Sequence, residues 1–508
     1  MKKLLVVLLI LSLLFTGCTK SSKKETETVS APIPVSGGTV NVGIRRPDTF
    51  NPLTTQYSSC REVFNLLYDS LINLSSNFVP TGNLAAKCIY KDDGKTLEVD
   101  LRDGVKWSDG SSFTSADVLY TVNFIKEHDT SYNACLDNVV KTYSSSGNSV
   151  IFELQQPDYG FASMLVFPII KSGFGDYEAA PVGTGGFILS NEGIKESGFA
   201  LTYNQNYHLG RPYIEHVNVK YLNTDLKMES AFSSGDIDFL WDGDLSSFSE
   251  KKGIDEWVQN RSCYEFLGFN YNCQIFSDDV VRQAISKAIN REELKNLTAD
   301  VVITPTNAPI HPSSAIYDKQ LDEEEYTQGS ATELLINDGY TLSASNVFTK
   351  GGANLSFEII VNNDNELRVR VATAVSEALS RNGISTKVVC LSNEEYKRRI
   401  EAGEYQIFIG GTIIGNMKNH TFLLGSSGKS NYFGYSGGVM DLRIEALMSA
   451  KESEEKAEGR KFLRSFTQSQ PLVGLYFSDR KVLSKTGIYV AALSPSGIFK
   501  YFYSWYRY

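Results

Sequence analysis

Apolar and polar residues alternate in several short stretches of the chain. The alternation is clearest over residues 97–101 and again over 217–221. A period of two places every second side chain on the same face of a strand, so one face is apolar and the other polar. The pattern therefore predicts a half-buried strand at each of these two places.

Other stretches repeat with the period of an α-helix. Val118, Val122 and Ile125 share one helical face, and Thr114 and Asp117 before them form an [ST]xx[DE] helix start. A second helix begins at Ser277 or Asp278, either of which can cap it. Its apolar residues form a single stripe, made of Val281, Ala284, Ile285, Ala288 and Ile289.

A strand–helix–strand unit is predicted further along the chain. Residues 355–361 are typical of a strand, the apolar residues of 371–379 share one helical face, and 386–391 are strand-like again. Asn382-Gly383 ends the helix between them. This order implies a parallel strand pair with a crossover helix, so the chain is predicted to be mixed α/β.

The N-terminus is typical of an exported protein. Lys2 and Lys3 precede a short apolar run over 4–15, which is too short to span a bilayer of roughly 30 Å as a helix. Small residues then precede Cys18, as in a bacterial lipoprotein box. We predict a signal peptide over 1–17 and lipidation of Cys18. A plain secretory signal with a chance cysteine is the alternative.

Residues 18–38 are predicted to form a flexible tether behind the lipidated cysteine. The segment is rich in Ser, Thr, Lys and Glu, has no apolar periodicity, and contains Pro32 and Pro34. Such a composition buries too little apolar surface to fold.

Length, charge and cysteine spacing narrow the function classes. The chain has 508 residues, 42% of them hydrophobic, which is enough for more than one core. Its formal charge is −10, which disfavours nucleic-acid binding. Six cysteines besides Cys18 show no CxxC spacing, so zinc and thioredoxin chemistry have no support. Their disulfide pairing stays open; they are Cys60, Cys88, Cys135, Cys263, Cys273 and Cys390.

Several different short motifs follow one another along the chain. Among them are DDGKT at 92–96, LRDGVKWSDG at 101–110, FTSADV at 113–118, PVGTGGF at 181–187, GDID at 235–238 and VRQAISKAINRE at 281–292. In this order the chain resembles the peptide- and nickel-type solute-binding proteins of ABC importers, the extracellular solute-binding proteins of family 5, which include oligopeptide- and dipeptide-binding lipoproteins. Within these motifs, Arg282 and Arg291 are expected on a solvated helical face, paired with nearby acids.

The resemblance implies an α/β, two-lobed periplasmic-binding-protein-like fold of class II, in its large three-sub-domain type, with a ligand cleft between the lobes. By analogy, 39–59, 181–265 and 476–508 form the core of lobe 1, 60–180 its added sub-domain, and 266–475 lobe 2. A ligand that contacts both lobes shifts such a protein toward its closed state.

The resemblance also implies where the ligand is contacted: along 410–418 and near the crossings between lobes. Each candidate also fits a packing or turn role. The candidates are Tyr57, Ser58, Trp241, Asp242, Tyr271, Asn272, Gly411, Thr412, Gly415, Asn416, Tyr432 and Tyr435.

The usual anchor for a peptide ammonium is missing from this sequence. Peptide-binding relatives present a Trp and an Asp along 410–418, where this chain has Thr412 and Gly415. Burying an ammonium without a partner costs several kcal/mol. Either Asp242 or Asp244 takes over the role of the missing acid, or the ligand has no ammonium group.

Enzyme motifs are absent from the sequence. There is no GxSxG or HExxH, and the GSSGKS at 425–430 lacks the first glycine of a phosphate loop because residue 423 is Leu423. The five histidines are scattered. We therefore expect no catalytic residues, no cofactor and no metal site.

Together these features predict an extracytoplasmic solute-binding lipoprotein of an ABC transporter. It would capture peptides or a related small solute and deliver them to the membrane permease and its ATPase. We expect a monomer, held at the outer face of the bacterial cell membrane by its lipid anchor only. The alternatives are a peptide- or pheromone-sensing or interaction lipoprotein with the same fold, and a protein that binds a nickel chelate or another non-peptide ligand.

Overall fold

The computed structural model describes residues 32–145, 148–174, 180–248, 250–322 and 329–508. The predicted signal peptide, the predicted lipidation site Cys18 and most of the predicted tether lie outside these residues. The last part of the tether is described: Val35 forms an isolated antiparallel bridge with Arg507, and the Gly37 N–H donates to the Tyr213 carbonyl.

A four-stranded sheet combines one strand from the N-terminal part of the chain with three strands from residues 187–221. Its order is β1 (Thr39–Ile44), β10 (His216–Tyr221), β9 (Gly198–Tyr203) and β8 (Phe187–Lys195), with β1 and β10 parallel and the other pairs antiparallel. The alternation predicted over 217–221 is confirmed, because Val217 and Val219 are buried and their neighbours are not. Helices α1 (Ser58–Phe64) and α3 (Asp225–Ser234) contact β1.

A second, antiparallel sheet carries the strand predicted over 97–101. Its order is β4 (Ala85–Lys91), β5 (Thr96–Leu101), β7 (Ser149–Leu154) and β6 (Val139–Ser145). Helix α2 (Ser115–Glu127) packs against it. The predicted helix start is confirmed as a capping box formed by Thr114 and Asp117. The short strands β2 (Ile72–Leu74) and β3 (Pro80–Gly82) pair beside this sheet.

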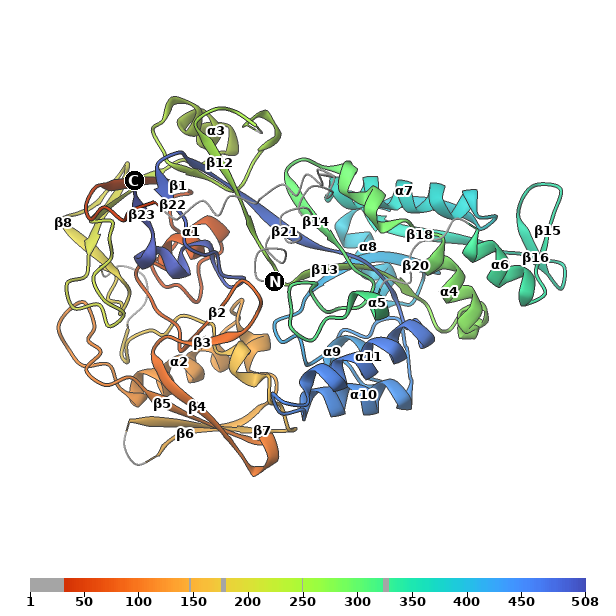
Figure 1. Cartoon of the computed structure of the whole chain (residues 1–508), viewed down its shortest axis with the longest axis horizontal. Helices are drawn as coiled ribbons and strands as arrows, with labels where there is room; N and C mark the ends of the chain where they lie inside the picture. Colours follow the sequence, from red (N-terminus) through yellow and green to blue (C-terminus); the bar gives the residue numbers. More distant parts are fainter. Residues whose placement is uncertain (1–31, 146–147, 175–179, 249, 323–328) are drawn as a thin grey trace, which may run out of the picture. The chain divides into compact units, whose positions relative to one another are not determined.

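The largest sheet has eight strands, and its long strand β21 contributes to four separate apolar clusters. Val473 and Leu475 of β21 belong to one of them, and Phe477, Val482 and Leu483 each belong to a different one. Figure 1 shows β21 beside β12 and β14, with which it pairs. The strands are β11 (Phe239–Leu240), β21 (Val473–Lys485), β13 (Cys263–Phe269), β20 (Ile407–Ile413), β18 (Ser356–Asn362) and β19 (Ser385–Leu391), with β12 (Ile254–Gln259) and β14 (Val301–Pro305) on β21.

The predicted strand–helix–strand unit is confirmed. β18 and β19 are parallel, and α7 (Glu366–Arg381) crosses between them. The Asn365 side chain caps this helix by accepting from the Arg368 N–H.

The remaining helices lie around the large sheet. Asp278, one of the two predicted caps, accepts from the Val280 N–H at the start of α4. α10 and α11 pack against each other (Figure 1). These helices are α4 (Asp279–Lys287), α5 (Lys319–Asp322), α6 (Ser330–Asn337), α8 (Asn393–Glu401), α9 (Thr421–Leu424), α10 (Gly438–Met448) and α11 (Glu455–Ser469).

Two small strand groups complete the fold. They are β15 (Thr341–Leu342) with β16 (Phe348–Lys350) and β17 (Ala353–Asn354), and the pair β22 (Ile488–Tyr489) and β23 (Tyr506–Arg507).

The expectation of a solvated Arg282 is wrong. Its side chain is buried, and it donates to the carbonyls of Gln470 (3.0 Å), Ser469 (2.6 Å) and Phe276 as well as to Asp279. A guanidinium has five N–H donors, so one buried arginine can satisfy several carbonyls at the end of a helix. Arg282 thus joins α4 to the end of α11.

From residue 34 onward, the buried apolar residues form several separate clusters. One packs the 39–44 and 187–221 strands with the C-terminal aromatic residues, another lies within 53–170, and two lie mainly between 264 and 477. The division into lobes given above remains a prediction. No helix in the described ranges combines the length and the apolar character that crossing a membrane requires.

Candidate functional site

A cavity of about 360 Å³ brings together segments that lie far apart in the sequence. α1 forms one wall, and the short helical turns η2 (Asn133–Leu136) and η3 (Phe161–Met164) form another. The β12–β13 turn, the end of β20, β21 and the 495–497 turn complete it. Its lining includes Ser58, Arg61, Glu62, Tyr132, Cys135, Met164, Arg261, Cys263, Ile413, Gly415, Arg480 and Ser496.

One ion pair in the lining is largely shielded from solvent. Arg480 Nη1 lies 2.5 Å from Glu62 Oε1, and both side chains are 12% exposed. Glu62 Oε2 accepts from the Ile498 N–H at 2.7 Å. Arg480 also donates to Gln259 Oε1 at 3.3 Å. The charges of Arg480 and Glu62 therefore compensate each other within the wall of the cavity.

Two further arginines, Arg61 and Arg261, line the cavity. Arg61 Nη1 donates to the Thr55 carbonyl at 2.8 Å, and the backbone N–H of Arg261 donates to Asp479 Oδ1 at 2.6 Å. Within the described ranges, neither guanidinium forms an ion pair with a carboxylate. The lining therefore holds three arginines and a single carboxylate, a formal excess of two positive charges.

Of the residues predicted from the sequence, Ser58 and Gly415 lie in the lining. The backbone of Gly415 faces Met164: a Cβ placed there would lie 3.0 Å from Met164 Sδ. Gly411 packs closely against a different side chain: a Cβ placed there would lie 2.3 Å from Glu265 Oε1. Glu265 is held by Arg368 in a two-point ion pair at 2.7 and 2.9 Å.

Asn416 joins the end of β20 to the segment before η3. Its Nδ2 lies 3.0 Å from both carboxylate oxygens of Asp158, which also accepts from the Gly160 N–H at 2.8 Å and from Asn419 at 3.3 Å. Burial raises the pKa of Asp158 to about 6, against the opposing effect of these hydrogen bonds. Beside this contact, Ser163 Oγ reaches the Gly415 carbonyl at 3.4 Å.

Trp241 and Asp242 are not among the residues that line the cavity. The Trp241 ring is buried against Phe499, with ring centroids 5.5 Å apart. Burial raises the pKa of Asp242, and the positive charge of Arg480 opposes that shift. Asp242 therefore contributes to the charge balance around the Arg480–Glu62 pair.

The other predicted residues do not line the cavity. Tyr271 and Tyr435 pack on each other with centroids 5.3 Å apart. Tyr57 precedes α1 and is exposed, as are Asn272 and Tyr432. Thr412 is half-buried on β20, opposite Tyr264. The role of all twelve candidates in ligand binding stays a prediction.

The charged residues of the lining were not among the candidates predicted from the sequence. Arg61 and Glu62 lie three and four residues after the candidate Ser58, so extending that segment by one helical turn finds them. No sequence motif around Arg261 or Arg480 indicates that these residues line a cavity. They come together only because β12 and β21 pair over residues 254–259 and 480–485.

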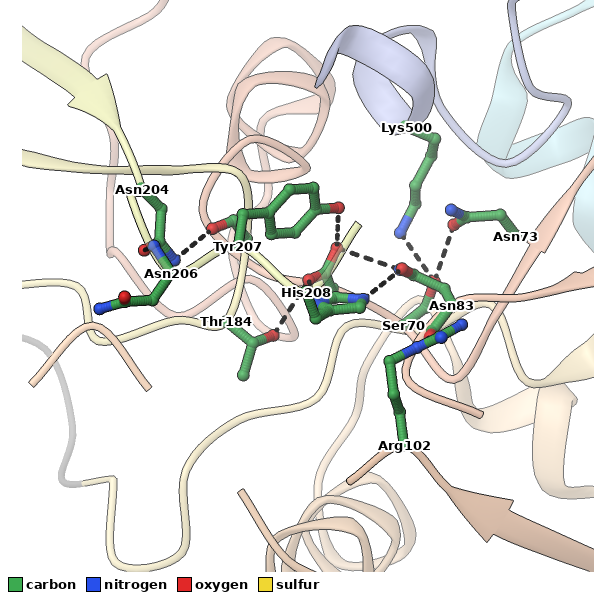
Figure 2. Close-up of polar contacts among 12 residues, drawn as sticks. Ser70, Asn73, Asn83, Arg102, Thr184, Asn204, Asn206, Tyr207, His208 and Lys500 are labelled. Atoms are coloured by element: carbon green, nitrogen blue, oxygen red, sulfur yellow. Dashed lines mark hydrogen bonds and ion pairs between the residues drawn. The ribbon is translucent and has the colours of Figure 1, made fainter. Parts of the chain in front are cut away.

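A buried polar network lies at the start of the segment predicted to be the added sub-domain. Figure 2 shows Thr184, Tyr207, His208 and Asn83 converging on it. Asp69 accepts from Asn83 Nδ2 (3.0 Å), the Tyr207 hydroxyl (3.2 Å) and Thr184 Oγ1 (3.3 Å). The network ties residues 69–83 to residues 184–208.

Lys500 enters the same network from the C-terminal segment. Its Nζ donates to Ser70 Oγ at 3.1 Å (Figure 2), and burial lowers the pKa of Lys500 to about 8. Although a serine beside a lysine can act as a nucleophile, Ser70 is fully buried and its hydroxyl lies 2.7 Å from the Ile72 carbonyl. This pair is structural.

Metal-binding side chains do not converge in the part of the chain that the structure describes. No group of three or more His, Cys, Asp or Glu residues there could hold a metal ion. The six cysteines are unpaired, with Cys60 buried and Cys390 exposed. Cys135 and Cys263 both line the cavity, and burial raises the pKa of each thiol.

The profile of the bacterial extracellular solute-binding proteins, family 5, matches residues 79–434, well over half of the chain. The chain belongs to this family. Its members are binding proteins and not enzymes, in agreement with the prediction from the sequence.

Individual relatives cover nearly all of the chain. The oligopeptide-binding protein AppA of Bacillus subtilis is 24% identical over 94% of this chain and 93% of its own. The crystal structure of B. subtilis AppA in complex with a nonapeptide has a TM-score of 0.66 at 21% identity, covering 94% of this chain and 100% of AppA. NikZ from Campylobacter jejuni in complex with Ni(L-His) has a TM-score of 0.68 at 18% identity, covering 92% and 99%. The structural matches confirm the predicted α/β binding-protein fold.

Proposed function

We propose that this chain captures a peptide or a related small solute in the cavity beside α1 and delivers it to an ABC permease and its ATPase. The wall of the cavity supports this function, because it is built from segments near residues 60, 132, 164, 261, 415 and 480. A solute in this cavity would contact residues of both predicted lobes, and such a ligand favours closure. The similarity to AppA, an oligopeptide-binding protein, supports a peptide.

Native mass spectrometry of the protein purified from its own host tests this proposal. The expected result is a bound solute of defined mass that saturates one site and raises the melting temperature. A ligand at 100 times its Kd adds about 2.7 kcal/mol to the free energy of unfolding. Absence of any retained or stabilising solute, across host extract and short peptides, would contradict the proposal.

We further propose that Cys18 carries the lipid that holds the protein at the outer face of the cell membrane. The support is the N-terminal sequence: two lysines, a short apolar run and small residues before the cysteine. Cys18→Ala should move the protein from the membrane fraction to the soluble fraction and abolish labelling by a fatty-acid analogue. Unchanged membrane retention and labelling would contradict the assignment.

A nickel chelate is the second candidate ligand. The chain provides no cluster of metal-binding side chains among its described residues, so a metal would have to arrive with its own ligands. The fold of NikZ, which was solved with Ni(L-His), supports this candidate. Titration with Ni²⁺ and L-histidine should raise the melting temperature more than L-histidine alone, and equal melting temperatures would exclude this candidate.

A further inference from the structure

The lining of the cavity carries more positive than negative charge. Arg61, Arg261 and Arg480 line the cavity together with a single carboxylate, that of Glu62. The pair between Arg480 and Glu62 is complete, because Glu62 also accepts from the Ile498 N–H. Two guanidinium groups therefore remain for a ligand.

These two arginines come from different parts of the fold. Arg61 lies in the middle of α1, and Arg261 lies in the turn between β12 and β13. Both side chains are half-buried. A half-buried charge is less screened by solvent than a fully exposed one, so each can contribute substantially to the binding of an anion.

An ammonium group has no corresponding partner in the lining. Its one carboxylate, Glu62, is already paired with Arg480. At the end of β20, Gly415 presents only its backbone to the cavity. A cation buried there would meet an excess of positive charge and no free carboxylate.

Building on the proposed function, we propose that the cavity selects solutes by a carboxylate group that Arg61 and Arg261 bind, and that it does not require an ammonium group. For a peptide, the C-terminal carboxylate then anchors the ligand and the N-terminus is free to be blocked. A guanidinium presents paired N–H donors that match the two oxygens of a carboxylate.

Two pools of random tripeptides with uncharged side chains test this inference on the full-length protein in detergent. One pool is N-acetylated with a free carboxylate; the other has a free amine and a C-terminal amide. Native mass spectrometry measures how much of each pool is retained. We expect the acetylated pool to be retained at least about tenfold more strongly, because charge-assisted hydrogen bonds are the stronger ones.

The possible outcomes separate the inference from the proposed function. Equal or preferential retention of the amidated pool would overturn the carboxylate anchor while leaving peptide capture intact. Retention of neither pool would contradict peptide capture itself and, with it, the carboxylate anchor.

Variants assign the effect to the two arginines. Arg61→Gln and Arg261→Gln should each weaken retention of the acetylated pool about tenfold and leave the melting temperature of the free protein nearly unchanged. Arg381→Gln, on the exposed face of α7, is the matched control and should behave as the wild type. Wild-type retention by both cavity variants would overturn the proposal.

A gain of function provides an independent test. Gly415 does not have a positive φ, so it can accept a side chain if the end of Met164 moves by a few tenths of an ångström. Gly415→Asp should lower retention of the acetylated pool and raise that of the amidated pool. Gly415→Asn has nearly the same shape without the charge and should not reverse the preference. If both variants have the same effect, charge does not govern selection.

Discussion

Asp158 provides a direct test of how burial and charge act at the contact between β20 and the segment before η3. Its carboxylate is buried, accepts from Asn416 at 3.0 Å, and has a pKa raised from 3.8 to about 6. The free energy needed to ionise Asp158 is therefore about 3 kcal/mol higher in the folded protein than in the unfolded chain, at about 1.4 kcal/mol for each pKa unit. Asp158→Asn keeps an oxygen for Asn416 and removes the charge.

The sign of the pH dependence follows from linkage. The folded state holds the Asp158 proton more tightly than the unfolded state, so this group favours folding most below pH 3.8, and that contribution is lost as the pH rises through 6. Relative to the wild type, Asp158→Asn should therefore gain about 2.5 kcal/mol in the free energy of unfolding between pH 4 and pH 7.5.

Urea denaturation at pH 4, 5, 6 and 7.5 measures this difference for the wild type and the variant. Asp137→Asn removes a half-exposed carboxylate and is the control, for which we expect no comparable change with pH. A stability difference between Asp158→Asn and the wild type that stays constant from pH 4 to 7.5 would refute the reasoning.

Three further changes test the surrounding structure. Asn416→Ala removes both hydrogen bonds to the Asp158 carboxylate and should destabilise the protein by about 3 kcal/mol at neutral pH, measured by urea denaturation; no loss would show that the contact is dispensable. Lys500→Met should stabilise the protein most below pH 8, by up to about 3 kcal/mol, because burial lowers the Lys500 pKa from 10.5 to about 8. That advantage should shrink as the pH rises from 8 to 10.5, and a gap that widens with pH would contradict it. Gly411→Ala should lower the melting temperature because its Cβ would overlap Glu265 Oε1, and a wild-type melting temperature would show that the Glu265 side chain moves aside.

The elements that the sequence predicted correctly are those set by local patterns. The Thr114–Asp117 capping box, the Asp278 cap and the β18–α7–β19 unit each depend on residues close together in the chain. A period of two or 3.6 and a capping side chain are enough to identify them.

The cavity could not be assembled in the same way. Arg61, Arg261 and Arg480 are separated by about 200 residues each, and only the pairing of β12 with β21 brings the last two together. Arg282 shows the reverse case: its helical position suggested solvent, but the end of α11 covers it and supplies carbonyl acceptors. Tertiary packing decides both outcomes, and no local pattern encodes it.

A solute held in the cavity beside α1 should draw the walls of the cavity together. Small-angle X-ray scattering tests this most directly, on protein stripped of solute and on the same protein saturated with the solute identified by native mass spectrometry. We expect a smaller radius of gyration for the saturated protein. Identical scattering from the two samples, with the solute demonstrably bound, would contradict it.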